Sequence, residues 1–171
     1  MNVTHDAMVV RVAVLDDFEA LLALERSIPE AAHWPPEEYA AMLHPAPTHA
    51  NPAANAEKYV ERHVLVAESH GALAGYAVGK LLHAGGEKLA EIENIAVAAA
   101  WRRRGVGQAL CEGVIAWCRA QGADVVELEV RAGNVAGIGM YERLGFLATG
   151  MRRQYYHDPV EDALLMTLRR R

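Results

Sequence analysis

The sequence predicts a mixed α/β fold, in which residues 1–171 form a single domain around one mixed central sheet with helices on both faces. Three observations lead to this prediction. Apolar, strand-like segments are joined by tight glycine turns in the middle of the chain. Strand-like and helix-like segments then follow one another, which favours strand–helix–strand units. A chain of 171 residues is large enough to bury one substantial core.

The first elements are a strand and a helix. Residues 8–14 are a short, valine-rich apolar run that reads as a strand. Asp16 or Asp17 then provides an N-cap, because a short polar side chain can accept a hydrogen bond from a free amide of the first helical turn. The helix should extend to about Ser27, with apolar positions at Leu21, Leu22 and Leu24.

A second short helix and a loop come next. Residues 28–36 interrupt the helical pattern, and residues 37–43 favour a short helix. Residues 44–55 contain three prolines among alanines and fit neither helix nor strand. Because strand signals resume directly after it, we interpret this Pro/Ala-rich segment as a loop insertion within the domain and not as a linker between domains.

Three strands are expected in the middle of the chain, at residues 64–68, 73–82 and 89–97. His70-Gly71 and Gly85-Gly86 should form the tight turns between them. Further strands are expected near residues 125–130, 146–156 and 163–168, so that hairpins and strand–helix–strand units share one sheet.

The segment after the third of these strands indicates an anion site. An apolar strand ending in Ile95, Ala96 and Val97 leads into an arginine-rich turn with Gly105 and Gly107, which opens a helix with an apolar face at Leu110, Val114, Trp117 and Cys118. Free amides and the positive end of the helix dipole meet there, which favours a phosphate group. The P-loop signature is absent, so an ordinary strand-to-helix turn would explain this segment equally well if it stood alone.

A second segment carries candidate catalytic groups. Val126, Leu128 and Val130 form the apolar face of a strand, and Glu127 and Glu129 lie on its other face. Asn134 then provides an N-cap for the next helix. Tyr141 follows seven residues later, at nearly the same azimuth of that helix.

Composition limits the classes of function. With 17 basic and 22 acidic residues the net charge is −5, which argues against general nucleic-acid binding. Cys111 and Cys118 lie seven residues apart on one helix and read as reduced thiols of a cytoplasmic protein. The histidines show no metal-binding spacing, so no metal is assigned. No segment resembles a signal peptide or a membrane span.

The arginine-rich turn and the segment from Asn134 to Phe146 together resemble the GNAT superfamily of acyl-CoA-dependent N-acyltransferases. The resemblance covers most of the chain from about Val64 onward, and it implies a single-domain GNAT fold with acetyl-CoA as co-substrate. By this resemblance, acetyl-CoA would be bound by Ile95, Ala96, Val97, Arg102, Arg103, Arg104, Gly105, Val106, Gly107, Gln108 and Asn134.

The C-terminal segment indicates which group within the superfamily the chain resembles. Arg-Arg-Gln-Tyr-Tyr at residues 152–156, followed by Glu-Asp-Ala at residues 161–163, is similar to the bacterial ribosomal-protein alanine N-acetyltransferases within that superfamily. This implies as acceptor the N-terminal alanine of a ribosomal small-subunit protein, bordered by Trp34, Tyr155 and Tyr156. Trp34 fits an anchor for its proline-rich loop equally well. Glu93, Gly137, Gly139 and the insertion depart from this subfamily, and they bear on the acceptor and not on the acetyl-CoA loop.

The expected chemistry needs a base and an acid. A peptide α-amine has a pKa near 8, so it is mostly protonated at neutral pH and must lose a proton before it attacks a thioester. Glu129 is the expected base, directly or through a water, as the resemblance implies. Glu91 and Glu93 are alternatives, whereas Glu127, on the same face as Glu129, is expected to be solvated. Tyr141 is expected to protonate the departing thiolate, and amides of residues 95–97 to stabilise the oxyanion, again as the resemblance implies.

Two other functions remain open. One is the same transfer to another peptide, to a lysine or to a small-molecule amine. The other is a regulatory module that binds acyl-CoA without turnover, which would need neither Glu129 nor Tyr141. A covalent route through Cys111 or Cys118 is disfavoured, because both lie on an apolar helix face without an evident histidine partner.

Overall fold

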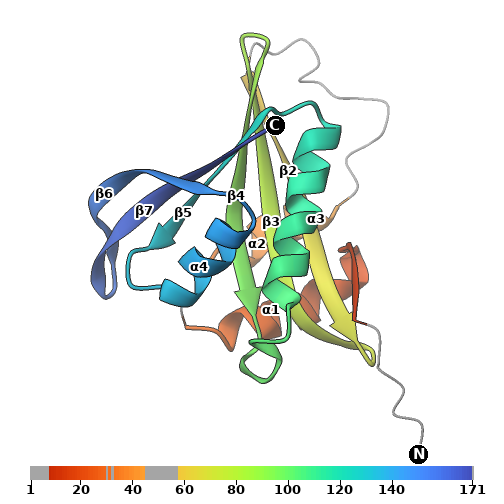
Figure 1. Ribbon diagram of the computed structural model, residues 1–171. Coiled ribbons are helices and arrows are strands. Elements are labelled where there is room, and N and C mark those ends of the chain that lie inside the picture. Colours follow the sequence, from red (N-terminus) through yellow and green to blue (C-terminus); the bar gives the residue numbers. More distant parts are fainter. Residues whose placement is uncertain (1–7, 30, 32, 45–57, 171) are drawn as a thin grey trace, which may run out of the picture.

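Seven strands form one sheet in this computed structural model, which describes residues 8–29, 31, 33–44 and 58–170 (Figure 1). The predicted mixed α/β fold is confirmed. In chain order the elements are β1 (Val9–Val12), η1 (Leu15–Asp17), α1 (Phe18–Arg26), α2 (Pro36–Leu43), β2 (Lys58–Ser69), β3 (Ala72–Ala84), β4 (Glu87–Val97), η2 (Ala99–Trp101), α3 (Val106–Ala120), β5 (Val125–Arg131), α4 (Val135–Arg143), β6 (Leu147–His157) and β7 (Val160–Arg169).

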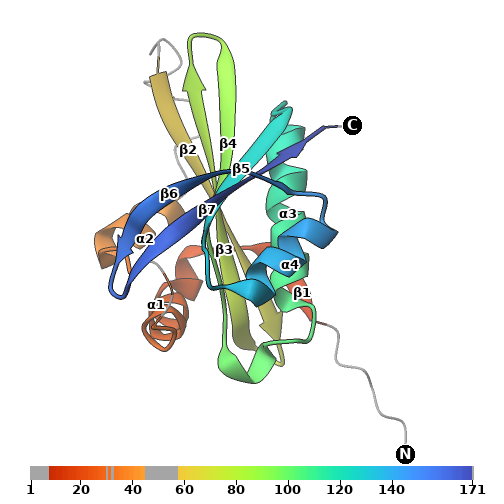
Figure 2. The same ribbon diagram turned by 60° about the vertical axis from the view of Figure 1, so that its left-hand side comes forward.

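The strand order across the sheet is β1-β2-β3-β4-β5-β7-β6. The β4–β5 pair is parallel and the other neighbours are antiparallel. Figure 2 shows the α1–α2 pair and the α3–α4 pair on opposite sides of the sheet. The sheet therefore separates two cores, and the single parallel pair lies near its middle.

The two hairpin turns form where the sequence predicts them. His70-Gly71 and Gly85-Gly86 all adopt positive φ, between 52° and 85°. A two-residue turn of this kind matches the right-handed twist of the strands that it joins. β2 begins at Lys58, earlier than the predicted start at residue 64. Most side chains of its first part are exposed, so that part has no apolar alternation by which the sequence could reveal it.

One core lies between the sheet and the α3–α4 pair, and its helix face is the predicted one: Leu110, Val114 and Cys118 are fully buried. A Cβ on Gly79 of β3 would lie 2.7 Å from Val114 Cγ1, so only glycine allows α3 to lie this close to the strand. The other core contains the predicted apolar positions of α1 together with Tyr39 and Tyr76. Both thiols are free and buried, and burial raises the pKa of each to about 12.

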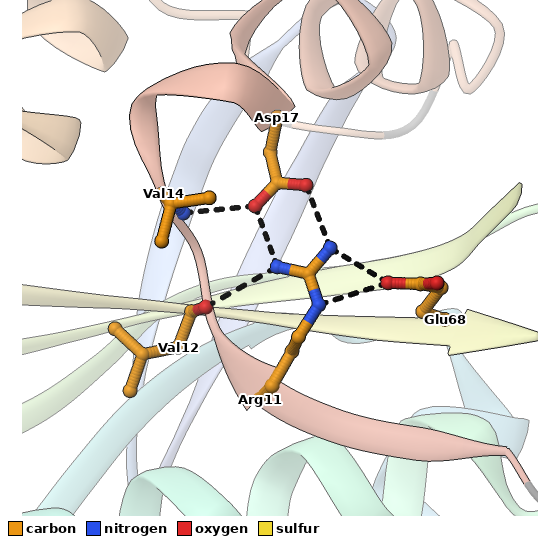
Figure 3. A network of polar contacts seen from close by, with 5 residues as sticks. All are labelled: Arg11, Val12, Val14, Asp17 and Glu68. Carbon is orange, nitrogen blue, oxygen red and sulfur yellow. Dashed lines mark hydrogen bonds and ion pairs between the residues drawn. The ribbon is translucent and has the colours of Figure 1, made fainter. Parts of the chain in front are cut away.

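The start of α1 is held by an ion-pair network and not by the predicted side-chain cap. Asp17 occupies the N-cap position but makes no hydrogen bond to the amides of α1. Its carboxylate accepts from the Val14 amide at 2.8 Å and pairs with two nitrogens of Arg11, which also contacts Glu68 of β2 (Figure 3). Arg11 lowers the pKa of Asp17, because the pairing favours the charged carboxylate. The network thus ties β1, η1 and β2 together.

The predicted insertion falls almost entirely outside the described residues, which resume at Lys58. Within the described part of the chain, no helix combines the length and the apolar character needed to cross a bilayer.

Candidate active site

The two parallel strands in the middle of the sheet separate after a short pairing. Ala90, Glu91 and Ile92 of β4 pair with residues 126–128 of β5, and the described pairing between these strands ends there. At the same point β4 contains a bulge, because Val78 pairs with Asn94 and Gly79 pairs with Ile92. Glu93 is the extra residue. A bulge bends its strand and increases the local twist, so β4 diverges from β5 and its main chain has no β5 partner along residues 93–97.

The glycine turn lies at the end of β4, beside this opening. Gly105 has φ of +83° and occupies the N-cap position of α3 without a side-chain cap, so the first amides of the helix remain available. A Cβ on Gly105 would meet no atom within 4 Å, so the space beside it is open. A Cβ on Gly107 would lie 3.4 Å from Met140 Sδ and 3.6 Å from Val97 Cγ2, which brings β4, α3 and α4 together at one point.

The three arginines of the turn differ in their contacts and in their backbone conformation. Arg102 Nε donates to the Val97 carbonyl at 3.3 Å and fastens the turn to β4. Arg104 lies over the Trp101 ring, 5.2 Å from its centroid. Arg103 has φ of +63°. Of the other predicted loop residues, Val106 is buried at the start of α3, and the Gln108 side chain bonds to Glu112.

Asn134 caps α4 as predicted. Its Oδ1 accepts a hydrogen bond from the Gly137 amide at 2.9 Å. A Cβ on residue 137 would lie 2.7 Å from Asn134 Nδ2. Gly137, which the sequence singles out as a departure, therefore makes room for the capping side chain.

Glu129 is the first residue of β5 beyond the paired segment, so its carboxylate lies at the edge of the opening. The side chain is 19% exposed and pairs with Arg152 of β6, with 3.0 Å between Glu129 Oε1 and Arg152 Nε. A hydrogen bond with Glu129 also raises the pKa of Tyr155. These groups line a cavity of about 310 Å³ that also includes Lys80, Glu91 and Glu127.

The alternative carboxylates, Glu91 and Glu93, have shorter contacts with their cations than Glu129 has. Glu93, which flanks the opening from β4, forms two hydrogen bonds with Arg62, at 2.7 and 3.0 Å. Glu91 bonds to Lys80 at 2.6 Å. Glu127 is exposed and lies opposite Glu91 within the paired segment, away from the opening. Position and partners therefore favour Glu129 as the available base.

Tyr141 lies on the opposite side of the sheet. It is 9% exposed and belongs to the core between β5 and α3, where its ring packs edge-on against Phe146 at 5.8 Å. Burial raises its pKa above the ordinary value, so the phenol remains protonated at neutral pH. The β5 alternation that buries Leu128 and Val130 on this side points Glu129 to the other. The two groups therefore face opposite sides of the sheet.

Of the predicted acceptor residues, one contacts Glu129 and the other two pack elsewhere. Tyr155 contacts Glu129, whereas Tyr156 packs under Arg131, whose Cζ is 4.1 Å from the centre of its ring. Trp34 packs against Tyr39 of α2, with 5.6 Å between ring centroids. Nothing among the described contacts joins Trp34 to Tyr155 directly.

Sequence reasoning missed a buried chain of polar groups beneath the acceptor side. The Tyr76 hydroxyl lies 3.2 Å from the Tyr39 hydroxyl and accepts a hydrogen bond from Asn94 Nδ2 at 3.0 Å. The chain links α2 to β4 at its bulge. Its one signal in the sequence is Asn94, a polar residue directly before the apolar run of residues 95–97.

Comparison with known proteins agrees with this arrangement. Residues 19–146 match the model of the acetyltransferase (GNAT) family. A segment of 81 residues, 46% of this chain, is 44% identical to the [ribosomal protein bS18]-alanine N-acetyltransferase of Escherichia coli K12 and covers 55% of it. A segment of 104 residues, 61% of this chain, is 36% identical to the N-alpha-acetyltransferase RimI of Mycobacterium tuberculosis and covers 64% of it. The chain thus spans between about half and two thirds of the length of these relatives.

The fold is also similar to a solved structure. The crystal structure of the ribosomal-protein-S18-alanine N-acetyltransferase from Escherichia coli superposes with a TM-score of 0.72 at 27% identity. That match covers 95% of this chain and 94% of the other.

Proposed function

We propose that this chain, which belongs to the GNAT family of acetyltransferases, transfers the acetyl group of acetyl-CoA to a primary amine. The acceptor we propose is the N-terminal alanine of a ribosomal small-subunit protein, which would place the reaction in the cytoplasm. One observation carries the activity: an opening in the sheet with an anion-binding turn at its edge and candidate acid and base groups on opposite sides.

The open space at Gly105 and the uncapped amides of α3 fit a pyrophosphate group. With the pyrophosphate there, the pantetheine arm would extend between α3 and α4 toward the opening. The β4 main chain at residues 95–97, which has no β5 partner, would offer amides to the carbonyl oxygen of the thioester. Asn134 holds the start of α4 beside this path.

The acceptor would approach from the Glu129 side. Glu129 takes a proton from the ammonium group, directly or through a water, and the amine attacks the thioester carbonyl. As the C–S bond breaks, Tyr141 gives its proton to the thiolate. The reaction thus needs no acyl-enzyme, in keeping with the raised pKa of Cys111 and Cys118, which leaves both thiols protonated.

The acceptor proposal rests on the names of the relatives and on the match of the tail. Trp34, Tyr155 and Tyr156 are the residues we propose for its binding. Mass spectrometry of a ribosomal-protein mixture incubated with the protein and labelled acetyl-CoA identifies the acceptor. Label on lysines or on small amines alone would favour the alternative substrates.

Binding of acetyl-CoA should raise the melting temperature, because a ligand that binds only the folded state stabilises it by mass action. Gly105→Glu should abolish that rise, since it places a negative charge in the pyrophosphate space. Gly105→Ala is the matched control: it carries the same positive-φ strain but no charge, so it should keep a substantial part of the rise. A wild-type protein with no thermal shift at saturating acetyl-CoA would contradict the assignment.

A further inference from the structure

The base that we propose is engaged by a cation in the structure. Arg152 Nε lies 3.0 Å from Glu129 Oε1, and the Arg152 guanidinium also lies over the Tyr155 ring, 5.3 Å from its centroid. Because the strand order is β5-β7-β6, Arg152 reaches this carboxylate across β7. Its guanidinium therefore lies where an acceptor amine would have to approach Glu129.

The two cations compete for this place. A base that takes a proton directly must lie within about 2.6–3.2 Å of the nitrogen that loses it, and a base that acts through one water must still have its carboxylate open to that water. A guanidinium at the same carboxylate would repel an incoming ammonium group, since like charges at contact distance oppose each other. Both groups are also hydrogen-bond donors without acceptor capacity, so no bond between them offsets the repulsion.

Of the cations beside this cavity, Arg152 is the one that can give up its ion pair with the least loss of stability. Its side chain is 55% exposed on an edge strand, and Glu129 is the one carboxylate with which it pairs among the described residues. An ion pair with one largely exposed partner is screened by water and contributes little to stability. Arg62 instead forms two hydrogen bonds with Glu93, and Lys80 contacts both Glu91 and Glu93. Each of those cations is fixed by two contacts with carboxylate oxygens, whereas Arg152 has one in the described part of the chain.

The backbone around Arg152 is irregular, which also permits movement of the side chain. The pairing of β6 with β7 shifts register between Arg152 and Tyr156, and Gln154 has φ of +52°. Tyr155, inside this irregular segment, contacts both Arg152 and Glu129. A guanidinium that leaves Glu129 can therefore keep its contact with the Tyr155 ring.

We propose that Arg152 is a positioning residue that occupies the amine subsite in the free protein and is displaced from Glu129 by the positively charged acceptor amine. In the free protein Arg152 satisfies the Glu129 carboxylate and keeps it on the acceptor side of the opening. When the acceptor binds, its ammonium group replaces the guanidinium and pairs with the Glu129 carboxylate. The inference rests on the proposed function, because it presumes that an amine meets Glu129.

Arg152→Gln tests this inference, and Arg153→Gln is its matched control. Arg153 is the next residue, is 82% exposed and pairs with Asp162, so its loss changes the net charge equally without touching Glu129. Two peptides are used, one with a free N-terminal alanine and the same peptide with that amine acetylated. Their dissociation constants are measured by calorimetry with each protein saturated with unacetylated CoA, and KM and kcat are measured for the free-amine peptide with acetyl-CoA.

Displacement predicts that Arg152→Gln lowers both the dissociation constant and the KM of the free-amine peptide about two- to fivefold. The gain arises because the Arg152–Glu129 ion pair no longer has to be broken when the peptide binds. The acetylated peptide should show no such gain, since it brings no charge to replace the guanidinium. Arg153→Gln should leave both peptides near the wild-type values.

If the proteins bind the peptide, three results would overturn the inference. One is an unchanged or weaker affinity of Arg152→Gln for the free-amine peptide. Another is an equal gain for the acetylated peptide, which would indicate simple steric relief. The third is a fall in kcat with KM unchanged, which would mean that Arg152 orients Glu129 during catalysis. A wild-type protein that binds the peptide but never acetylates it would refute the proposed function alone, because the binding measurements still decide the displacement. Absence of peptide binding in all proteins would refute both.

Discussion

Glu129→Gln should lower kcat by about a hundredfold or more, since the amide keeps the shape of the side chain but cannot take a proton from the acceptor. Affinity for acetyl-CoA should stay nearly unchanged, because the glycine turn lies on the other side of the opening. Steady-state rates with an alanine peptide, together with acetyl-CoA binding by calorimetry, measure both quantities.

Glu127→Gln is the control for this loss. Glu127 lies on the same face of β5, two residues earlier, and is exposed within the paired segment. The Glu127→Gln substitution removes the same charge from the same cavity, so the rate of this variant should remain within a few fold of the wild type. Equal rates for Glu129→Gln and the wild type would move the base elsewhere. Glu93, which flanks the opening from β4, would then be the next candidate.

Tyr141→Phe should lower kcat about ten- to a thousandfold while leaving KM for acetyl-CoA near its wild-type value. The proton is needed only as the C–S bond breaks, so its loss falls on the chemical step and not on binding. The hydroxyl makes no hydrogen bond to another described residue, and the ring, which supplies the packing against Phe146, is retained. The melting temperature should therefore change little.

A structural role for this tyrosine predicts the reverse pattern, a lower melting temperature with the rate per folded molecule preserved. Rate and melting temperature measured on one preparation separate the two roles. Tyr59→Phe, on a tyrosine that stacks on His83 beside the β3–β4 turn, serves as the control and should affect neither quantity strongly. An unslowed but destabilised Tyr141→Phe would remove this residue from the mechanism.

The parts of the fold that repeat a local pattern could be predicted from the sequence. The apolar face of α3 and the alternation of β5 are periodic, and the turns at His70-Gly71 and Gly85-Gly86 need positive φ, so all are visible locally. The first part of β2 could not be predicted, because its exposed side chains have no periodicity.

The contacts that define the site are not local. The bulge at Glu93 appears only when β3 and β4 are paired, and the divergence of β4 from β5 follows from it. Arg152 lies 23 positions after Glu129 and reaches it across another strand, so no spacing rule indicates the contact. Residue type and resemblance therefore identified Glu129, Tyr141 and the free amides of residues 95–97 as candidates, but neither the bulge at Glu93 nor the cation that pairs with Glu129.

The most direct test of acetyl transfer to an N-terminal amine uses two synthetic peptides with one sequence, which begins with alanine and contains an internal lysine. One has a free α-amine and the other has its α-amine blocked. Each is incubated with the protein and acetyl-CoA and then sequenced by tandem mass spectrometry. Transfer to the N-terminal amine predicts a single acetyl group on the alanine nitrogen of the free peptide and no modification of the blocked one. Acetylation of the lysine in both peptides, or of neither peptide while acetyl-CoA is bound, would contradict it.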